Sequence, residues 1–375
     1  MGEVVERITR KNENLESTLP LTISAQYGLI DQNEFFDKRI ASKDVSGYFL
    51  VRNGEFAYNK STSSDAPWGA IKRLDRYESG VLSTLYIVFK ILDERKTSSD
   101  YIVTYYNTDL WHKGIQAIAA EGARNHGLLN VAPADFFETN LTMPKDYAEQ
   151  QQIGSFFQML DHLITLHQRK FDKLQVLKKA MLEKMFPKNG SSVPEIRFKG
   201  FTDAWEQRKV QGVADRFDNL RIPVAANLRV HGTTPYYGAN GIQDYVEGFT
   251  HDGEFVLVAE DGANDLKNYP VKCVNGRIWV NNHAHVLQGK AGIADNSFLA
   301  FAISQSDIES LLVGGGRAKL NAETLMSIEF RLPCLQEQYR IGEYLTQLNH
   351  LITLHQRELE KLQNIKKSML EKMFV

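Results

Sequence analysis

The sequence predicts an α+β protein that is built from one unit written twice. Two similar α/β globular domains are joined and spaced by two long antiparallel coiled-coil helices, in a tandem repeat with pseudo-two-fold character. Three observations predict this fold. Residues 162–186 recur with few changes as residues 350–374. Both copies carry one narrow apolar seam, and the globular stretches before them share landmarks in the same order.

The repeated stretch is expected to form a long helix. Its letters HLITLHQR and MLEKMF are the same in both copies, and the motif Glu-Gln-x-x-Ile-Gly stands upstream at residues 149–154 and 337–342. Apolar residues advance mostly by alternating steps of four and three, as in a coiled coil, so each helix needs a partner with the same seam. The predicted seam residues are Ile153, Phe157, Leu160, Ile164, His167, Phe171 and Leu174 in the first copy, and Ile341, Leu345, Leu348, Ile352, His355, Leu359 and Leu362 in the second.

A histidine stands near the middle of each seam. If the helices pair antiparallel, His167 and His355 cross near the centre, where polar residues fix the register at some cost in stability. The alternative, that each histidine lies at the edge of the seam and is solvated, stays open. A metal site made of the two histidines is much less favoured, because only Glu358 stands at helical spacing to complete it.

The domain boundaries follow from the two helices. We expect a first domain at 1–142, the first long helix at 143–187, a linker and second domain at 188–332, and the second long helix at 333–375. β-branched and aromatic content predicts strands at 49–51, 56–58, 81–89, 255–259, 277–280, 284–287 and 299–303, with helices at 100–118, at 307–312 and after Asn321.

The two globular stretches match weakly but in the same order. Gly54-Glu55-Phe56 corresponds to Gly253-Glu254-Phe255, and Leu129-Asn130 corresponds to Leu320-Asn321 a short way before each helix. The segment 191–209 has no counterpart before Met1, so the chain begins about where Val210 of the second unit lies. A shared scaffold that carries two different recognition surfaces would give this pattern.

Composition limits the classes of function without choosing one. The net charge is −2 and the pI about 6.6, which gives no global argument for nucleic acid, although a local basic stripe is enough. Two cysteines offer no disulfide framework, so a reducing cytoplasm is the default compartment. No apolar run approaches the roughly 20 residues that span a bilayer, and we expect no membrane partner.

A search for catalytic or metal-binding motifs finds little. The glycines at 314–316 are followed by Arg317, which is not a phosphate-binding loop. Asp261 with Asp265 and Lys267 is only faintly similar to a nuclease motif, and Asp-Gly is better explained as a turn. His283 and His285 alternate on a strand, where a packing or binding-face role is favoured over a ligand pair. We predict no catalytic residue, no metal and no cofactor in this chain.

Polar and basic loop residues remain, of the types that contact bases and phosphates. For any one of them, a merely solvated side chain is the simpler interpretation, but the set on duplicated domains is more persuasive. The candidates are Lys60, Ser61, Thr62, Ser63, Lys72, Arg73, Arg124, Asn125, His126, Tyr236, Tyr237, Asn240, Asn264, Asn281, Asn282, His283, Arg317 and Lys319.

The order of these parts resembles the specificity subunit of a Type I restriction-modification system over essentially the whole chain. The resemblance rests on two diverged domains, each followed by a proline, by Glu-Gln-x-x-Ile-Gly and by a long helix. It implies two target recognition domains that each read one half of a bipartite, gapped site in double-stranded DNA. The helix pair would set the spacing between the halves.

The resemblance also implies partners. Two modification subunits, which carry S-adenosylmethionine and methylate adenine, would dock on the helices and domains, and restriction subunits would join that complex in a bacterial or archaeal cytoplasm. Two alternatives stay open: a two-headed coiled-coil adaptor for proteins, and the recognition half of a single-chain restriction enzyme. The second should carry catalytic motifs in the same chain.

Overall fold

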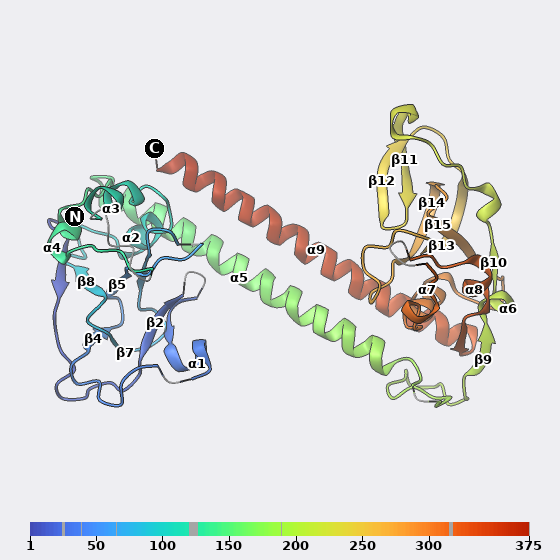
Figure 1. Ribbon diagram of the computed structural model, residues 1–375, viewed down its shortest axis with the longest axis horizontal. Coiled ribbons are helices and arrows are strands. Elements are labelled where there is room, and N and C mark those ends of the chain that lie inside the picture. Colours follow the sequence, from blue (N-terminus) through green and yellow to red (C-terminus); the bar gives the residue numbers. More distant parts are fainter. Residues whose placement is uncertain are drawn as a thin grey trace. The chain divides into compact units, whose positions relative to one another are not determined.

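The computed structural model describes residues 1–24, 27–38, 40–64, 66–119, 127–188, 190–314 and 318–374. The chain forms two compact units (Figure 1). Unit 1 comprises Met1–Leu166 and Leu359–Val375, and unit 2 comprises His167–Glu358. The predicted fold class is confirmed: each unit combines antiparallel β-sheet with short helices, and each takes part of both long helices.

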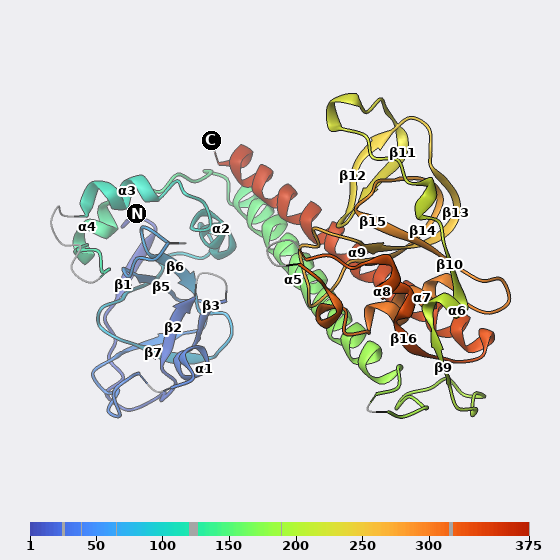
Figure 2. The same cartoon turned by 45° about the vertical axis from the view of Figure 1, so that its right-hand side comes forward.

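Unit 1 is built on a four-stranded sheet in the order β1-β8-β5-β6, with two separate strand pairs, β2–β3 and β4–β7. Figures 1 and 2 both show helices α2, α3 and α4 together on one side of this unit, away from α1 and β2. Phe56, Tyr58, Phe89 and Phe136 fill the core between sheet and helices. The elements are β1 Val5–Ile8, β2 Leu21–Ser24, β3 Gly28–Asp31, α1 Gln32–Phe36, β4 Phe49–Arg52, β5 Phe56–Asn59, β6 Ala70–Arg73, β7 Ser79–Leu82, β8 Ile87–Ile91, α2 Ser99–Tyr105, α3 His112–Ile118 and α4 Pro133–Glu138.

Unit 2 is built on a six-stranded sheet in the order β10-β15-β13-β14-β11-β12, in which only β11 and β14 run parallel. A separate pair joins β9 to β16. Phe298, Val256 and Leu287 lie in the core beneath the sheet. The elements are β9 Glu206–Lys209, α6 Val210–Val213, β10 Ala214–Arg216, η1 Asp218–Leu220, η2 Ala226–Leu228, β11 His231–Gly238, β12 Gly241–Val246, β13 His251–Ala259, β14 Val271–Val280, β15 Ala284–Gly289, α7 Asn296–Ser304, η3 Glu309–Leu311, α8 Ala322–Ser327 and β16 Glu329–Leu332.

Several predicted elements differ in the structure. The strand expected at 299–303 is wrong, because these residues belong to helix α7, whose N-terminus is capped by the Asp295 side chain. The single strand expected at 81–89 is two strands, separated by a turn in which the Tyr86 N–H donates to the Ser83 carbonyl. The helix expected at 100–118 is likewise divided into α2 and α3, and 307–312 holds only the short η3.

The two long helices are α5, Tyr147–Lys184, and α9, Leu335–Met373. All fourteen predicted seam residues are buried or half-buried, while most side chains between them are exposed. Within unit 1, Lys366 forms an ion pair with Asp161 at 2.5 Å, and within unit 2 the His167 and His355 Nδ1 atoms lie 3.1 Å apart. In unit 1 the Phe157 and Phe374 rings also meet, with centroids 6.3 Å apart, so α9 runs antiparallel to α5 there. Over the described stretches, no helix has both the length and the apolar character that crossing a membrane requires.

The repeated motif at the start of each long helix has the same structural role in both units. In unit 1, Gln150 accepts from the Ser98 N–H at 2.9 Å and donates to the Pro144 carbonyl at 2.8 Å. In unit 2, Gln338 accepts from the Asp295 N–H and donates to the Pro333 carbonyl, both at 2.9 Å. Since Ser98 and Asp295 are the N-caps of α2 and α7, the glutamine fixes the start of a core helix against the long helix.

The motif glycine permits this close approach. A Cβ atom on Gly154 would lie 2.7 Å from the Tyr101 backbone nitrogen, and one on Gly342 would lie 3.0 Å from the Phe298 backbone nitrogen. Only a residue without a side chain lets the helices meet at this distance. The two units therefore share one scaffold, residue for residue, at the base of each long helix.

Candidate nucleic-acid interface

The candidate loops of the two domains occupy equivalent places. In unit 1, the Leu129 N–H donates to the Lys60 carbonyl at 3.0 Å, next to a bridge between Ser61 and Leu128. In unit 2, the Leu320 N–H donates to the Glu260 carbonyl at 2.7 Å, next to a bridge between Asp261 and Lys319. We call these segments the paired loops: residues 60–63 with 127–129 in unit 1, and residues 260–264 with 318–320 in unit 2.

The paired loops of unit 1 hold four of the predicted residues. The Thr62 N–H and hydroxyl both donate to the Gly127 carbonyl, at 2.7 and 3.1 Å. Lys60 reaches the Val131 carbonyl at 3.4 Å, and its burial lowers the pKa of the ammonium. Ser61 and Ser63 are exposed. The predicted residues Arg124, Asn125 and His126 lie outside the described residues, immediately before Gly127.

In unit 2, side-chain hydrogen bonds gather three turns into one cluster. Asn240 donates to the Gly262 carbonyl and accepts from the Asn264 N–H, both at 2.8 Å. The His283 ring bonds to the Asp261 carboxylate, and the Asn281 side chain accepts from the His283 N–H at 2.8 Å. The neighbouring Asn282 is exposed. These turns, with Lys319, form what we call the polar loop cluster.

The structure places the remaining predicted residues elsewhere. Lys72 donates to the Asn107 side chain at 2.8 Å, and burial lowers its pKa. Arg73 forms an ion pair with Asp100 at 2.7 Å at the start of α2. Tyr236 and Tyr237 are only 1% and 6% exposed and belong to the interior of unit 2. These four side chains hold elements together within their own units and do not lie in the paired loops. Arg317 lies outside the described residues.

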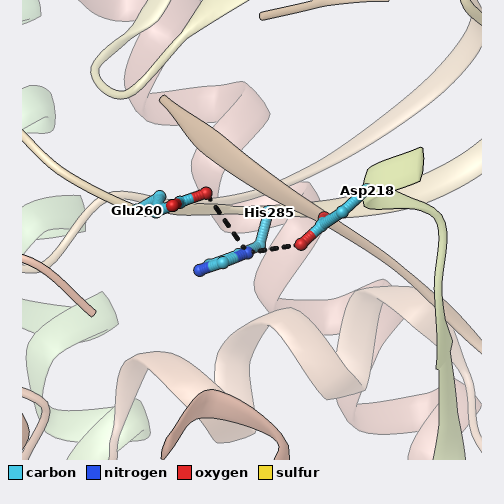
Figure 3. Close-up of side chains that lie close together, drawn as sticks. All are labelled: Asp218, Glu260 and His285. Atoms are coloured by element: carbon cyan, nitrogen blue, oxygen red, sulfur yellow. Dashed lines mark hydrogen bonds and ion pairs between the residues drawn. The ribbon is translucent and has the colours of Figure 1, made fainter. Parts of the chain in front are cut away.

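Three ionisable side chains of unit 2 lie close together, with the histidine buried and the two carboxylates half-buried (Figure 3). They are Asp218 from η1, Glu260 at the end of β13 and His285 on β15. The His285 Nδ1 atom lies 2.7 Å from Asp218 and 3.7 Å from Glu260, and its Nε2 atom lies 2.9 Å from the Leu320 carbonyl. The network therefore ties the two halves of the paired loops, at Glu260 and Leu320, to the sheet.

The donor set of this network fits a structural role better than a metal site. Both ring nitrogens of His285 already face oxygen atoms of the protein, Nδ1 that of Asp218 and Nε2 the Leu320 carbonyl. Arg221 donates to Glu260 at 2.7 Å and lies 3.5 Å from Asp218, and Lys319 bonds to Glu260 at 2.8 Å. The two carboxylates are already matched by these cations.

The neighbouring charges and hydrogen bonds also lower the pKa values of the two carboxyl groups. Burial acts to raise the pKa of Asp218, but hydrogen bonds from His285 and the Val286 N–H, with the charge of Arg221, outweigh it and hold that pKa below its usual range. The pKa of Glu260 is lowered in the same way, because hydrogen bonds from Lys319 and Arg221 exceed the effect of burial. The sequence singled out only His285; nothing in its spacing marked Asp218 or Glu260.

Comparison with known proteins identifies the unit 2 domain. Residues 202–364 match the model of the Type I restriction modification DNA specificity domain. A curated type I restriction enzyme specificity subunit of Haemophilus influenzae is 42% identical over 164 residues, which are 44% of this chain and 42% of that protein. That alignment thus spans less than half the length of the curated relative.

Two more distant relatives extend over most of the chain. The Type I restriction enzyme MjaVIII specificity subunit of Methanocaldococcus jannaschii is 20% identical over 328 residues, which are 78% of this chain and 73% of that protein. The crystal structure of a Type-I restriction-modification system S subunit from M. genitalium shares the fold, with a TM-score of 0.67 at 13% identity over 99% of this chain and 94% of that one. The resemblance found in the sequence is therefore confirmed: residues 202–364 match the Type I restriction modification DNA specificity domain, and the chain is similar over most of its length to specificity subunits of type I systems.

Proposed function

We propose that this chain is the sequence-specific DNA-recognition subunit of a Type I restriction-modification complex and is not itself a catalyst. Each globular domain reads one half of a bipartite, gapped site in double-stranded DNA. The helix pair sets the gap between the halves. The names of the relatives and the matched domain support this proposal at the level of the family, and the chain's own residues support its division into two reading domains.

One observation carries the proposal: the paired loops are joined by the same hydrogen bond in both units, but their side chains differ. Lys60 and Ser61 in unit 1 stand where Glu260 and Asp261 stand in unit 2. A constant scaffold that presents different donors and acceptors is what two domains need if each is to read a different set of base edges. In unit 2, the exposed Asn282 and the half-exposed Lys319 are our candidates for contact with DNA.

The same proposal assigns the chemistry to partner subunits. Two modification subunits would bring S-adenosylmethionine and methylate adenine, and restriction subunits would cut, all in a bacterial or archaeal cytoplasm. The chain's own contribution is to bind, orient and space the two half-sites. The near-neutral net charge of −2 fits a subunit whose partners supply part of the positive surface around the DNA.

The decisive experiment is a methylation map of DNA by long-read sequencing. Cells would express the methyltransferase encoded beside this chain, with and without the chain. We expect a gapped, two-part motif methylated at adenine only when the chain is present. If the chain binds the methyltransferase and no motif arises, the proposal of sequence-specific recognition is wrong.

A domain exchange tests the division of labour. Residues 1–142 would be replaced by the corresponding domain of another specificity subunit, and the methylated motif would be mapped again. We expect one half of the motif to change and the other half and the gap to stay the same. A change in both halves would contradict independent reading. The matched control replaces the 200–332 region, which should change the opposite half.

The adaptor alternative makes the opposite prediction. A two-headed protein adaptor would hold its partners without sequence preference in DNA. Substituting Asn282→Ala in the polar loop cluster would then leave the methylated motif unchanged in every position. We expect it instead to relax the motif in one half-site only, because a base contact worth about 1–3 kcal/mol would be lost.

A further inference from the structure

The two long helices carry a lysine at the same position of the repeat, but its surroundings differ between the units. In unit 1, Lys366 of α9 forms an ion pair with Asp161 of α5 at 2.5 Å. In unit 2, the equivalent lysine is Lys178 of α5, and the position of Asp161 in the repeat is taken by Asn349 of α9. Unit 2 therefore keeps the cation and has an amide in place of its carboxylate.

The charge of Lys178 is not matched within unit 2. The side chain is half-buried, and burial lowers the pKa of its ammonium group. Among the described residues, no carboxylate forms an ion pair with it. A partly buried charge costs free energy unless an opposite charge matches it. An anion from outside the unit would supply that match.

Lys178 and Asn349 both line a groove in unit 2 that has a volume of about 990 Å³. The groove lies between the start of β14, the end of α7 and the facing stretches of α5 and α9. We call it the basic groove, after the basic side chains that line it: Lys178, Lys267, Lys272, His350 and Arg357.

The charges of the basic groove are not balanced. Of the described residues that line it, Glu254 and Asp307 carry the negative charges, and the Glu254 carboxylate accepts from the Asn296 side chain at 3.3 Å. The equivalent groove of unit 1 is balanced, because its described lining includes three carboxylates and three lysines. These are Asp109, Asp161, Glu371, Lys113, Lys366 and Lys367.

The basic groove adjoins the polar loop cluster. Pro270, Val271 and Lys272 line both the groove and a smaller hollow of about 220 Å³, which Asn240 of the cluster also lines. Hydroxyl and amide side chains of the kinds that contact DNA phosphates lie in the groove as well, among them Asn268, Asn275 and Thr346. A duplex whose bases face the polar loop cluster therefore brings its phosphates toward Lys272.

We propose that the basic groove binds the phosphate backbone of DNA beside the half-site that unit 2 reads, and that the equivalent groove of unit 1 does not. This inference rests on the proposed function. Lys178, Lys272 and Arg357 each neutralise a phosphate, which releases counterions and strengthens binding. Since phosphates are the same in every sequence, the groove adds affinity but no letters to the target. The two half-sites are thus held unequally.

The test measures how the affinity for DNA depends on salt. The full chain, in complex with its methyltransferase, binds a duplex that carries the mapped methylated motif. Lys178→Gln and Lys272→Gln should each make the slope of log affinity against log salt shallower by about 0.9, because one phosphate contact is lost. Asn349→Asp should do the same, since it gives Lys178 the carboxylate that Lys366 has in unit 1.

The matched control is Lys366→Gln, the same change at the same position of the repeat, which should leave the slope unchanged. Slopes that Lys178→Gln and Lys272→Gln leave unchanged overturn the inference, while a gapped motif that is still methylated upholds the proposed function. Altered letters in the motif would mean that the groove reads bases, which also overturns it. Loss of methyltransferase binding would assign the groove to an acidic segment of that partner. If the unchanged chain gives no motif, the proposed function fails and this inference fails with it.

Discussion

Replacing Gly154 with alanine tests whether the close contact between the long helix and α2 holds unit 1 together. The new Cβ would lie 2.7 Å from the Tyr101 nitrogen and 2.8 Å from the Asp100 carbonyl carbon. Carbon atoms pack at about 3.5–4 Å, so the start of α2 has to move by roughly 1 Å, and backbone atoms cannot rotate away. Overpacking of this kind costs about 1–3 kcal/mol.

Alanine also favours the helix over glycine by about 1 kcal/mol, which offsets part of that cost. We therefore expect Gly154→Ala to destabilise unit 1 by up to about 2 kcal/mol. The matched control is Gly114→Ala in α3, where the new Cβ would meet, among the described residues, just the Thr139 side chain at an ordinary 3.5 Å. This control should be neutral or stabilise unit 1 by up to about 1 kcal/mol.

The measurement should report on unit 1 alone, because two units need not unfold together. Hydrogen exchange followed by mass spectrometry of peptides from 98–106, over a series of urea concentrations, gives the free energy of opening of this region. Exchange from β13 and β15 serves as the reference in unit 2. If Gly154→Ala proves as stable as Gly114→Ala, the argument from close approach is refuted.

Three further outcomes follow from the same structure. Burial, and after it the charges of His167 and Lys170, lower the pKa of His355. The neutral histidine should therefore contribute its full stabilisation to the helix pair above about pH 6.5, and this contribution should be lost as the pH falls through the lowered pKa of His355. In acid titrations of helix content, His355→Leu should abolish that dependence. The pKa values of Asp218 and Glu260 are lowered, so the two carboxylates should stabilise unit 2 above about pH 4 and cease to do so below it. A fluorescence titration of unfolding, with Asp218→Asn as the reference, would test this. Inserting one helical turn within 162–185 should lengthen the gap of the methylated motif without changing its letters, and altered letters would argue against a spacer.

The long helices were predictable because their pattern is long and repeated. A seam that alternates steps of four and three over many turns has few other interpretations, and the second copy repeats the signal. The burial of Leu160, Leu345 and Leu348 follows this pattern directly. Short elements lack such redundancy, and the errors in the prediction fall there.

Helix α7 shows why. Its residues Phe298, Leu299, Ala300, Ala302 and Ile303 are all buried, so the helix has no polar face and no amphipathic period. A short, continuously apolar run gives the same pattern as a buried strand. The informative signal was Asp295 before the run, whose side chain caps the helix.

The sequence could predict which loops form the candidate site, but not which of their side chains face outward. Asn240, Asn264 and His283 were chosen as residue types, and the structure brings their turns together through specific hydrogen bonds. Tyr236 was chosen for the same reason, yet it lies in strand β11, its hydroxyl bonds to the Val224 backbone and its ring is buried. Whether a polar side chain faces outward depends on neighbours that are distant in sequence, which composition does not encode.

The division of the chain into units has a consequence for how such genes can change. Unit 1 ends at Leu166 and resumes at Leu359, so both borders fall within or next to the identical letters HLITLHQR at 162–169 and 350–357. One genetic crossover in each copy of that repeat would exchange the whole of unit 2 and leave both segments of unit 1 in place. Each join would fall between identical residues on a helix, and neither core would be cut. Recombination could therefore assemble new pairs of domains without any need for compensating mutations.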